Sequence, residues 1–179
     1  MFAYSSIEHM GLMTFAFGMG GPVATFAGLL HMTVHSLTKS AIFFAVGHAA
    51  QKSGTQLMDG IRGLIKTNPT IGWGLALGTL AILGMPPFGV FTSEFMILTT
   101  AMHTYPWSMP FLLIALGVAF ASLFGRMQLM VFGETSGKRL PHPPALIPVF
   151  VHLALVLLLG LYVPPYLAAW YRQAAALIG

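Results

Sequence analysis

Cysteine is absent from this sequence of 179 residues, and charged residues make up only 7% of it. The lack of cysteine excludes disulfide bonds, cysteine-ligated iron–sulfur clusters and thiolate zinc sites on this chain. We therefore expect no cofactor here and assign any redox chemistry to partner proteins. Ordinary soluble domains carry roughly 25% charged residues, so the scarcity of charge predicts that lipid is the main solvent.

The basic residues do not form the surface that nucleic acid requires. The formal charge is +4, but the eight lysines and arginines are dispersed, and Lys138-Arg139 is the one adjacent pair. A phosphate backbone calls for a clustered basic patch or stripe. We therefore exclude a nucleic-acid partner and interpret the positive charge as loop charge that sets orientation in a membrane.

Hydrophobic residues make up 56% of the chain and predict an all-α integral membrane protein. A membrane helix needs about 20 predominantly apolar residues, so the length allows about five crossings. The predicted helical segments are 2–18, 22–51, 70–102, 107–132 and 145–163. We expect one transmembrane domain over 1–164 and a short interfacial tail over 165–179, where Trp170 and Tyr171 suit the membrane surface.

A break is predicted inside segment 70–102. Pro86 and Pro87 remove two backbone donors at its centre, and Gly84 and Gly89 flank them. Successive prolines interrupt a helix, so two half-helices are expected. A single broken crossing places the basic loops around 52–69 and around Lys138 on the same side, which the positive-inside rule predicts to be cytoplasmic. The expected location is the cytoplasmic (inner) membrane of a bacterium or archaeon.

Three ionisable residues recur at intervals of four inside segment 22–51, namely His31, His35 and Lys39. This spacing places them on one helix face, each within reach of the next. Histidine titrates near neutrality, and a lysine removed from water can also release its proton there. The column therefore predicts a proton path. The alternative is that the histidines pack between helices while Lys39 extends its amine to the membrane surface.

A metal site is a further interpretation of the same column, because two histidines four residues apart form a common half of a zinc site. No carboxylate or third histidine lies near His31 and His35 in the sequence, and Lys39 would repel a cation. We therefore expect no metal on this chain.

Glu94 follows the double-proline break and is the best single candidate for a switching proton site. Ends of broken helices offer backbone dipoles and space for water, which stabilise a charge inside a membrane. The alternative is that Glu94 caps the second half-helix from its first turn. Both roles are compatible.

Other ionisable residues receive weaker predictions. Glu8 and His9 are adjacent and point in different directions on a helix, and Glu8 is predicted to belong to the proton path. Arg126 lies near the end of segment 107–132, where a path role and extension to the membrane surface are equally open. His48 is assigned to the path or to the membrane interface.

Three blocks of this sequence resemble the antiporter-like membrane subunits of complex I and related enzymes. They are Ala3-Tyr4-Ser5-Ser6-Ile7-Glu8-His9-Met10-Gly11, the stretch from His31 to Lys39, and Gly84-Met85-Pro86-Pro87-Phe88-Gly89 followed by Ser93-Glu94-Phe95. The order and spacing match as well. Within the family, the residues of these blocks are most similar to those of the F-type subunits of hydrogenase-4.

The resemblance implies a fold of two inverted repeats, each with a broken helix, of which this chain is similar to most of the second repeat plus the last helix. It also implies that His31, His35 and Lys39 belong to a central hydrophilic axis and that Glu94 is the ionisable residue of the second broken helix. The first repeat is absent from the sequence. We expect it from a longer polypeptide or from a second chain, and favour the former.

The function predicted on this basis is a proton-translocating membrane subunit of a hydrogenase-4, formate hydrogenlyase or NADH dehydrogenase-like complex. Its expected partners are other membrane subunits and a peripheral hydrogenase or dehydrogenase arm that holds the catalytic centre. One alternative is a subunit of a multisubunit sodium/proton antiporter, which shares these motifs. Another is a membrane scaffold in which the polar residues only join helices.

Overall fold

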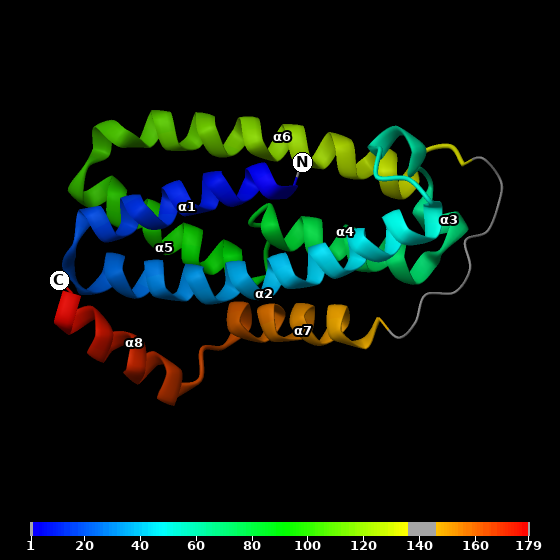
Figure 1. Cartoon of the computed structure of the whole chain (residues 1–179). Helices are drawn as coiled ribbons and strands as arrows, with labels where there is room; N and C mark the ends of the chain where they lie inside the picture. Colours follow the sequence, from blue (N-terminus) through cyan, green and yellow to red (C-terminus); the bar gives the residue numbers. More distant parts are fainter. Residues whose placement is uncertain (1, 136–145, 179) are drawn as a thin grey trace.

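The structure is a computed structural model that describes residues 2–135 and 146–178, and all regular structure in these ranges is helical (Figure 1). The elements are α1 (Phe2–Met19), α2 (Gly21–Ser53), η1 (Met58–Gly60), α3 (Leu64–Thr67), α4 (Pro69–Ile82), α5 (Gly89–Thr104), η2 (Pro106–Ser108), α6 (Met109–Phe132), α7 (Ile147–Leu161) and α8 (Pro165–Ile178). The predicted all-α fold is confirmed.

The long helix α2 lies at the centre of the bundle. It packs against α1, α4, α5, α7 and α8, and Figure 1 shows α1, the α4–α5 pair and α7 running alongside it. Apolar side chains such as Leu30, Val34 and Ile42 are fully buried on it. The face of a helix that packs against its neighbours is expected to be apolar, so the polar residues that α2 buries are exceptions with a specific environment.

A tight turn joins α1 and α2 into an antiparallel hairpin. Gly20 and Gly21 both adopt positive φ values, 68° and 79°, which glycine reaches without steric cost. Pro22 occupies the first turn of α2, as predicted. Because almost no chain separates the two helices, residues at equal distances from Gly20 lie at the same level along the hairpin.

The predicted break in segment 70–102 is present between α4 and α5. α4 begins at the end of the bundle where α2 ends, and α5 finishes at the opposite end, so the two half-helices together traverse the bundle once (Figure 1). Asn68 caps α4 by accepting a hydrogen bond from the backbone N–H of Ile71 at 3.2 Å. Between the halves, Gly84 adopts a left-handed φ of 65°.

α7 supports the break from outside. The hydroxyl of Thr92 donates to the carbonyl of Gly160 at 3.1 Å. A side chain at Gly160 would overlap the backbone at Pro87, and one at Gly89 would come within 2.7 Å of Val34. Glycines at these two positions allow the backbone of α7 and the broken segment to approach closely, as small residues do at membrane helix interfaces.

The outer surface of the bundle is strongly apolar. Phe111, Ile114 and Val118 on α6 are 70%, 66% and 65% exposed. By length and composition, α2 and the stretch Pro106–Phe132 are able to cross a membrane, and α7 with α8 would form a further span bent by 74°. The membrane-embedded character is thus supported, whereas the predicted count of about five crossings stays a prediction.

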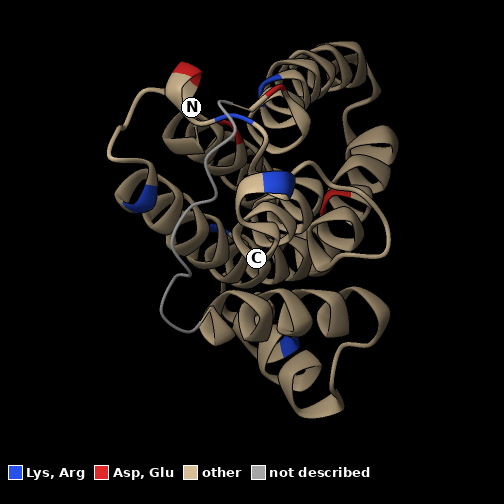
Figure 2. Cartoon of the chain, turned by 90° about the vertical axis from the view of Figure 1, so that its right-hand side faces the viewer, with Lys and Arg blue, Asp and Glu red and all other residues tan. Residues whose placement is uncertain are grey.

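The charged loops gather at one end of the bundle. The connection between α2 and α4 and the end of α6 lie together there (Figure 1). Figure 2, which looks onto this end, shows how little of the ribbon is coloured as charged. An exposed ion pair joins Arg62 to Asp59 at 3.1 Å. Lys138 and Arg139 lie outside the described residues, so their place on the predicted side is not tested.

The predicted tail forms the helix α8, which is docked against α2. The hydroxyl of Tyr171 lies 2.5 Å from that of Thr33, and its ring meets Phe26 edge-on at 5.6 Å between centroids. Trp170 is 63% exposed and available to an interface. The division into a domain over 1–164 and a tail over 165–179 stays a prediction.

Candidate functional site: a buried chain of histidines beside Glu94

The three ionisable residues of α2 face the interior of the bundle. His31, His35 and Lys39 are 0%, 6% and 6% exposed. The rings of His31 and His35 stack with centroids 6.2 Å apart. Lys39 lies one turn further along the same face. Groups that carry a proton are costly to place in an apolar interior unless they are paired, so their partners define the site.

His9 from α1 is the centre of this site. Its Nδ1 lies 3.0 Å from Nε2 of His31, and its ring lies 4.8 Å from that of His35, centroid to centroid. The side chain is 2% exposed. The α1–α2 hairpin thus adds a third imidazole to the two that the sequence pattern indicated.

Glu94 reaches the same histidine from α5. Its Oε1 lies 3.6 Å from Nδ1 of His9, and its side chain is 12% exposed. The carboxylate lies against Gly84, where a Cβ atom would overlap it. The N-cap residue of α5 is Phe88, which makes no side-chain capping hydrogen bond, and the first turn holds no acidic residue. The alternative in which Glu94 caps this half-helix is therefore wrong, because Glu94 lies more than one turn inside the helix.

Ser93 lies at the far end of the hydrogen-bonded histidines, next to His31. Its hydroxyl lies 2.8 Å from Nδ1 of His31 and within 2.9 Å and 3.1 Å of the carbonyls of Val90 and Gly89. If the serine donates to one of these carbonyls, its oxygen accepts from Nδ1–H of His31. Nε2 of His31 then accepts a hydrogen bond from Nδ1–H of His9, so the hydrogen bonds form a connected series.

Lys39 is held at the beginning of α1. Its ammonium donates to the carbonyl of Phe2 and to the hydroxyl of Ser5. It also lies 5.8 Å from the ring centroid of Phe43. Both hydrogen bonds are buried. The alternative in which the amine of Lys39 extends to the membrane surface is therefore wrong.

Glu8 points away from the histidines, toward α6. It borders a cavity of about 280 Å³ that also touches Glu94, and a second one of about 370 Å³ that touches Arg126. Both volumes exceed what one water molecule occupies. The adjacent residues Glu8 and His9 therefore serve different neighbours, as the sequence indicated, and Arg126 shares a cavity with Glu8.

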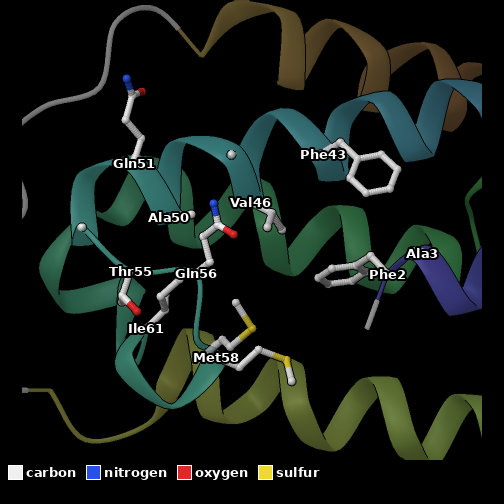
Figure 3. A pocket seen from close by; sticks show the side chains of 13 residues that line it. Phe2, Ala3, Phe43, Val46, Ala50, Gln51, Thr55, Gln56, Met58 and Ile61 are labelled. Atoms are coloured by element: carbon white, nitrogen blue, oxygen red, sulfur yellow. The ribbon is translucent and has the colours of Figure 1, made fainter.

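A cavity of about 670 Å³ lies near Lys39 at the loop end of the bundle. Figure 3 shows its lining, in which Phe2 and Phe43 lie toward one end and Gln56 and Met58 come from the loop after α2. Phe2 and Phe43 are also the residues that contact Lys39. Lys39 contacts the main-chain carbonyl of Phe2 and lies near the Phe43 ring, so these two residues connect the cavity to the buried ammonium.

The remaining histidines do not join the cluster. His48 is half-buried and its Nδ1 lacks a partner among the described residues. His152 lies on α7 with Nδ1 at 2.6 Å from the carbonyl of Pro148. His103 is exposed near the end of α5, and His142 lies outside the described residues. A path role for His48 stays a prediction.

Sequence reasoning did not identify His9 as a member of the site, although a signal was present. His9 and His31 lie eleven residues before and eleven residues after Gly20. In an antiparallel hairpin with a minimal turn, such positions lie at the same level, so two ionisable residues there are candidates for contact. A search for ionisable residues placed symmetrically about Gly20 would have found this contact.

Comparisons with known proteins agree with this architecture. Residues 1–125 match the family described as NADH:quinone oxidoreductase/Mrp antiporter, transmembrane. The chain is 46% identical over 178 residues to a hydrogenase-4 component F homolog of Methylacidiphilum infernorum, covering 99% of this chain and 37% of that protein. It is 24% identical to a Na⁺/H⁺ antiporter protein of Alkalihalophilus pseudofirmus, covering 91% and 34%.

Solved structures share the fold. A chain of an archaeal membrane-bound sulfane sulfur reductase superposes with a TM-score of 0.87 at 30% identity, over 98% of this chain and 36% of that one. Respiratory complex I from Thermus thermophilus gives a TM-score of 0.84 at 23% identity, over 99% and 39%. The chain therefore spans little more than a third of the length of these relatives.

Proposed function

Because the chain belongs to the NADH:quinone oxidoreductase/Mrp antiporter transmembrane family, we propose that it forms one proton-conducting half of a membrane subunit. The observation that supports this most directly is the buried series Ser93–His31–His9 beside the carboxylate of Glu94. Imidazole accepts a proton on one nitrogen and releases another from its second nitrogen. A row of buried imidazoles that ends at a carboxylate is suited to transfer protons.

The proposed route begins at Lys39 and ends at Glu94. A proton leaves the Lys39 ammonium toward His35, one turn away on α2. It passes to His9, whose ring lies 4.8 Å from that of His35, and then to Glu94 at 3.6 Å. Short rotations of the rings, or single water molecules, close the intervals that exceed hydrogen-bond length.

The cavities supply the two ends of this route. Water in the large cavity beside Phe2 and Phe43 reloads Lys39, and water beside Glu8 receives the proton from Glu94. Glu8 borders the cavities on both sides of it. We therefore assign Glu8 to the release path. Arg126 shares the second cavity with Glu8 and lies toward the loop end of α6, so it is not assigned to the exit.

We propose that a partner hydrogenase or dehydrogenase arm drives this movement, with neighbouring membrane subunits transmitting the coupling and the other half of the family fold completing the path. The relative with 46% identity is a hydrogenase-4 component F homolog. At an effective dielectric constant of about 20, one charge placed 4 Å away changes a site's energy by roughly 4 kcal/mol. A change of that size is enough to load or empty Lys39 or Glu94.

The second candidate is a component of a sodium/proton antiporter, supported by 24% identity to a protein of such an antiporter. The chemistry of the site favours protons. Lys39 carries donors only and repels a cation, and hard cations prefer oxygen ligands over the three imidazoles that line the route. Transport that requires sodium would decide for this candidate.

We further propose that the loop end of the bundle faces the cytoplasm, in the inner membrane of a bacterium or archaeon. Lys52, Arg62 and Lys66 lie in or beside the connection between α2 and α4. Basic residues in short loops are concentrated on the cytoplasmic side.

The experiment is proton pumping by the complete complex reconstituted into vesicles, with Lys39→Ala and Glu94→Gln introduced separately. Both variants are expected to lose pumping by tenfold or more, because a positioned proton-transfer group contributes about 10²- to 10⁴-fold. The matched control is His103→Gln, an exposed position on α5 near its end. Full pumping in both variants, with normal assembly, would refute the assignment.

A further inference from the structure

We propose that His9, His31 and His35 form a binding site for a divalent transition-metal cation of the Zn²⁺ type. A ring nitrogen of each histidine lies within 4.8 Å of those of the other two, and all three residues are buried. The ligand set combines α1 and α2, so the site exists only in the folded hairpin. We expected no metal because no third histidine lies near His31 and His35 in the sequence. The fold brings His9 from α1 to this position, so that reason no longer holds.

The spacing of the nitrogen atoms suits a tetrahedral ion. Zn–N bonds of about 2.0–2.1 Å at tetrahedral angles require ligand nitrogens roughly 3.3 Å apart. Nδ1 of His9 and Nε2 of His31 are 3.0 Å apart. The ring nitrogen of His35 lies at most about 1.5 Å beyond the required distance from the other two. Small ring rotations therefore bring three imidazoles around one ion and leave a fourth position for water.

The surroundings resemble those of a metal centre. Ligating histidines commonly donate their other ring N–H to a fixed acceptor, which holds the ring in orientation. Ser93 provides this acceptor for Nδ1 of His31 at 2.8 Å and is itself anchored to the backbone of α5. Nδ1 of His35 is buried without a hydrogen-bond partner among the described residues, so this side chain retains unused binding capacity.

Charge and access also permit the ion. The ammonium of Lys39 is directed to the carbonyl of Phe2 and to Ser5, whereas the carboxylate of Glu94 lies 3.6 Å from His9 and offsets part of the ion's charge. A cavity of about 250 Å³ borders His35 and is lined by Met10, Met13 and Met32. It gives an ion a route to the imidazoles from outside the hairpin.

A bound cation would occupy the nitrogens that the proposed proton route uses, so it would block transport. This consequence depends on the proposed function, whereas binding itself does not. The test therefore measures binding first. The complete complex is titrated with Co²⁺, which replaces Zn²⁺ and shows visible absorption bands when bound tetrahedrally. We expect one such site per chain, lost by competition with Zn²⁺ and unaffected by excess Mg²⁺.

Variants assign the site to this chain. His35→Gln is expected to abolish the Co²⁺ bands, and Ser93→Ala to weaken binding by about 10- to 100-fold, as loss of an orienting partner does. His31→Gln serves as a second ligand variant if His35→Gln does not assemble. His103→Gln, an exposed residue outside the cluster, leaves binding unchanged.

The outcomes separate the two ideas. Co²⁺ bands that persist in an assembled His35→Gln or His31→Gln complex, or their absence from the parent complex, would overturn the metal site. Binding in the parent that leaves proton pumping intact would establish the site and count against the proton route through these histidines.

Discussion

Ser93 shows how one small side chain determines the orientation of a buried ring. Its hydroxyl is fixed by the carbonyls of Gly89 and Val90 and presents its oxygen to Nδ1 of His31 at 2.8 Å. This contact decides which nitrogen of His31 faces His9. Ser93 on α5 therefore sets the donor-to-acceptor direction of the hydrogen bonds that join His31 and His9. It lies on the opposite side of the site from the column in α2.

Removing this hydroxyl is expected to affect both stability and transport. Ser93→Ala leaves a buried ring nitrogen without a partner, which costs about 1–3 kcal/mol. Proton pumping is expected to fall roughly tenfold, the effect of 1.4 kcal/mol on a barrier. The measurement is pumping rate together with thermal unfolding of the complex. Thr99→Ala is the control, since Thr99 is exposed on the same helix and bonds only its own backbone; equal effects of both variants would contradict the role of Ser93.

At this scale the sequence predicted which side chains share a buried helix face better than it predicted their contacts. The four-residue spacing of His31, His35 and Lys39 was enough to place them on one face. The contact of Lys39 with the carbonyl of Phe2 was not predictable in that way, since a main-chain carbonyl has no residue-specific signal. Glu94 was correctly expected beside the break, but its neighbour His9 depends on packing between α1 and α5.

The broken helix is the element on which the site depends. Its two halves end at Ile82 and begin at Gly89, and the carboxylate of Glu94 folds back against Gly84 between them. Gly84 is required for two reasons, a left-handed backbone conformation with φ of 65° and the absence of a side chain. An alanine there is strained and also displaces Glu94.

Gly84→Ala is therefore expected to reduce proton pumping by tenfold or more without removing any titratable group. The control is Gly125→Ala on α6, where an added Cβ has nothing within 4 Å and where alanine favours the helix. Pumping rate and assembly are measured for both variants. Normal pumping in an assembled Gly84→Ala complex would show that the position of Glu94 is not critical.

The elements themselves were predictable because strong local signals define their ends. Pro22 begins α2, Asn68 with Pro69 begins α4, and Pro86-Pro87 separates α4 from α5. The small turns η1 and α3 were predicted only as a polar connection, because short segments without a sustained apolar period carry little information.

At the scale of the whole molecule, the loop end and the opposite end of the bundle are expected to face different sides of the membrane. Asp59, whose side chain is 93% exposed, lies in the loop after α2, and Arg172 is exposed on α8. The chain has no cysteine of its own, so a single introduced cysteine reports its location without interference.

Asp59→Cys is therefore expected to react with an impermeant thiol reagent only from the cytoplasmic face, and Arg172→Cys only from the outer face. Labelling of intact cells, with permeabilised cells as the control for reactivity, measures this. Labelling of both positions from the same side would contradict a single broken crossing formed by α4 and α5.

The helical segments were predictable from the sequence, but the surface that each one presents to its neighbours was not. The strongly exposed apolar face of α6, including Phe111 and Ile114, is equally compatible with lipid and with further membrane subunits. The chain spans 37% of the length of a relative, and no pattern within its residues indicates what covers this face.

The central claim is that protons pass from the column on α2 to Glu94 through His9. His9→Phe preserves a flat ring of similar size and removes both exchangeable nitrogens. Proton pumping by the reconstituted complex is expected to fall by tenfold or more, while His103→Phe, at an exposed position, pumps normally. An assembled His9→Phe complex that pumps at the parental rate would contradict the account.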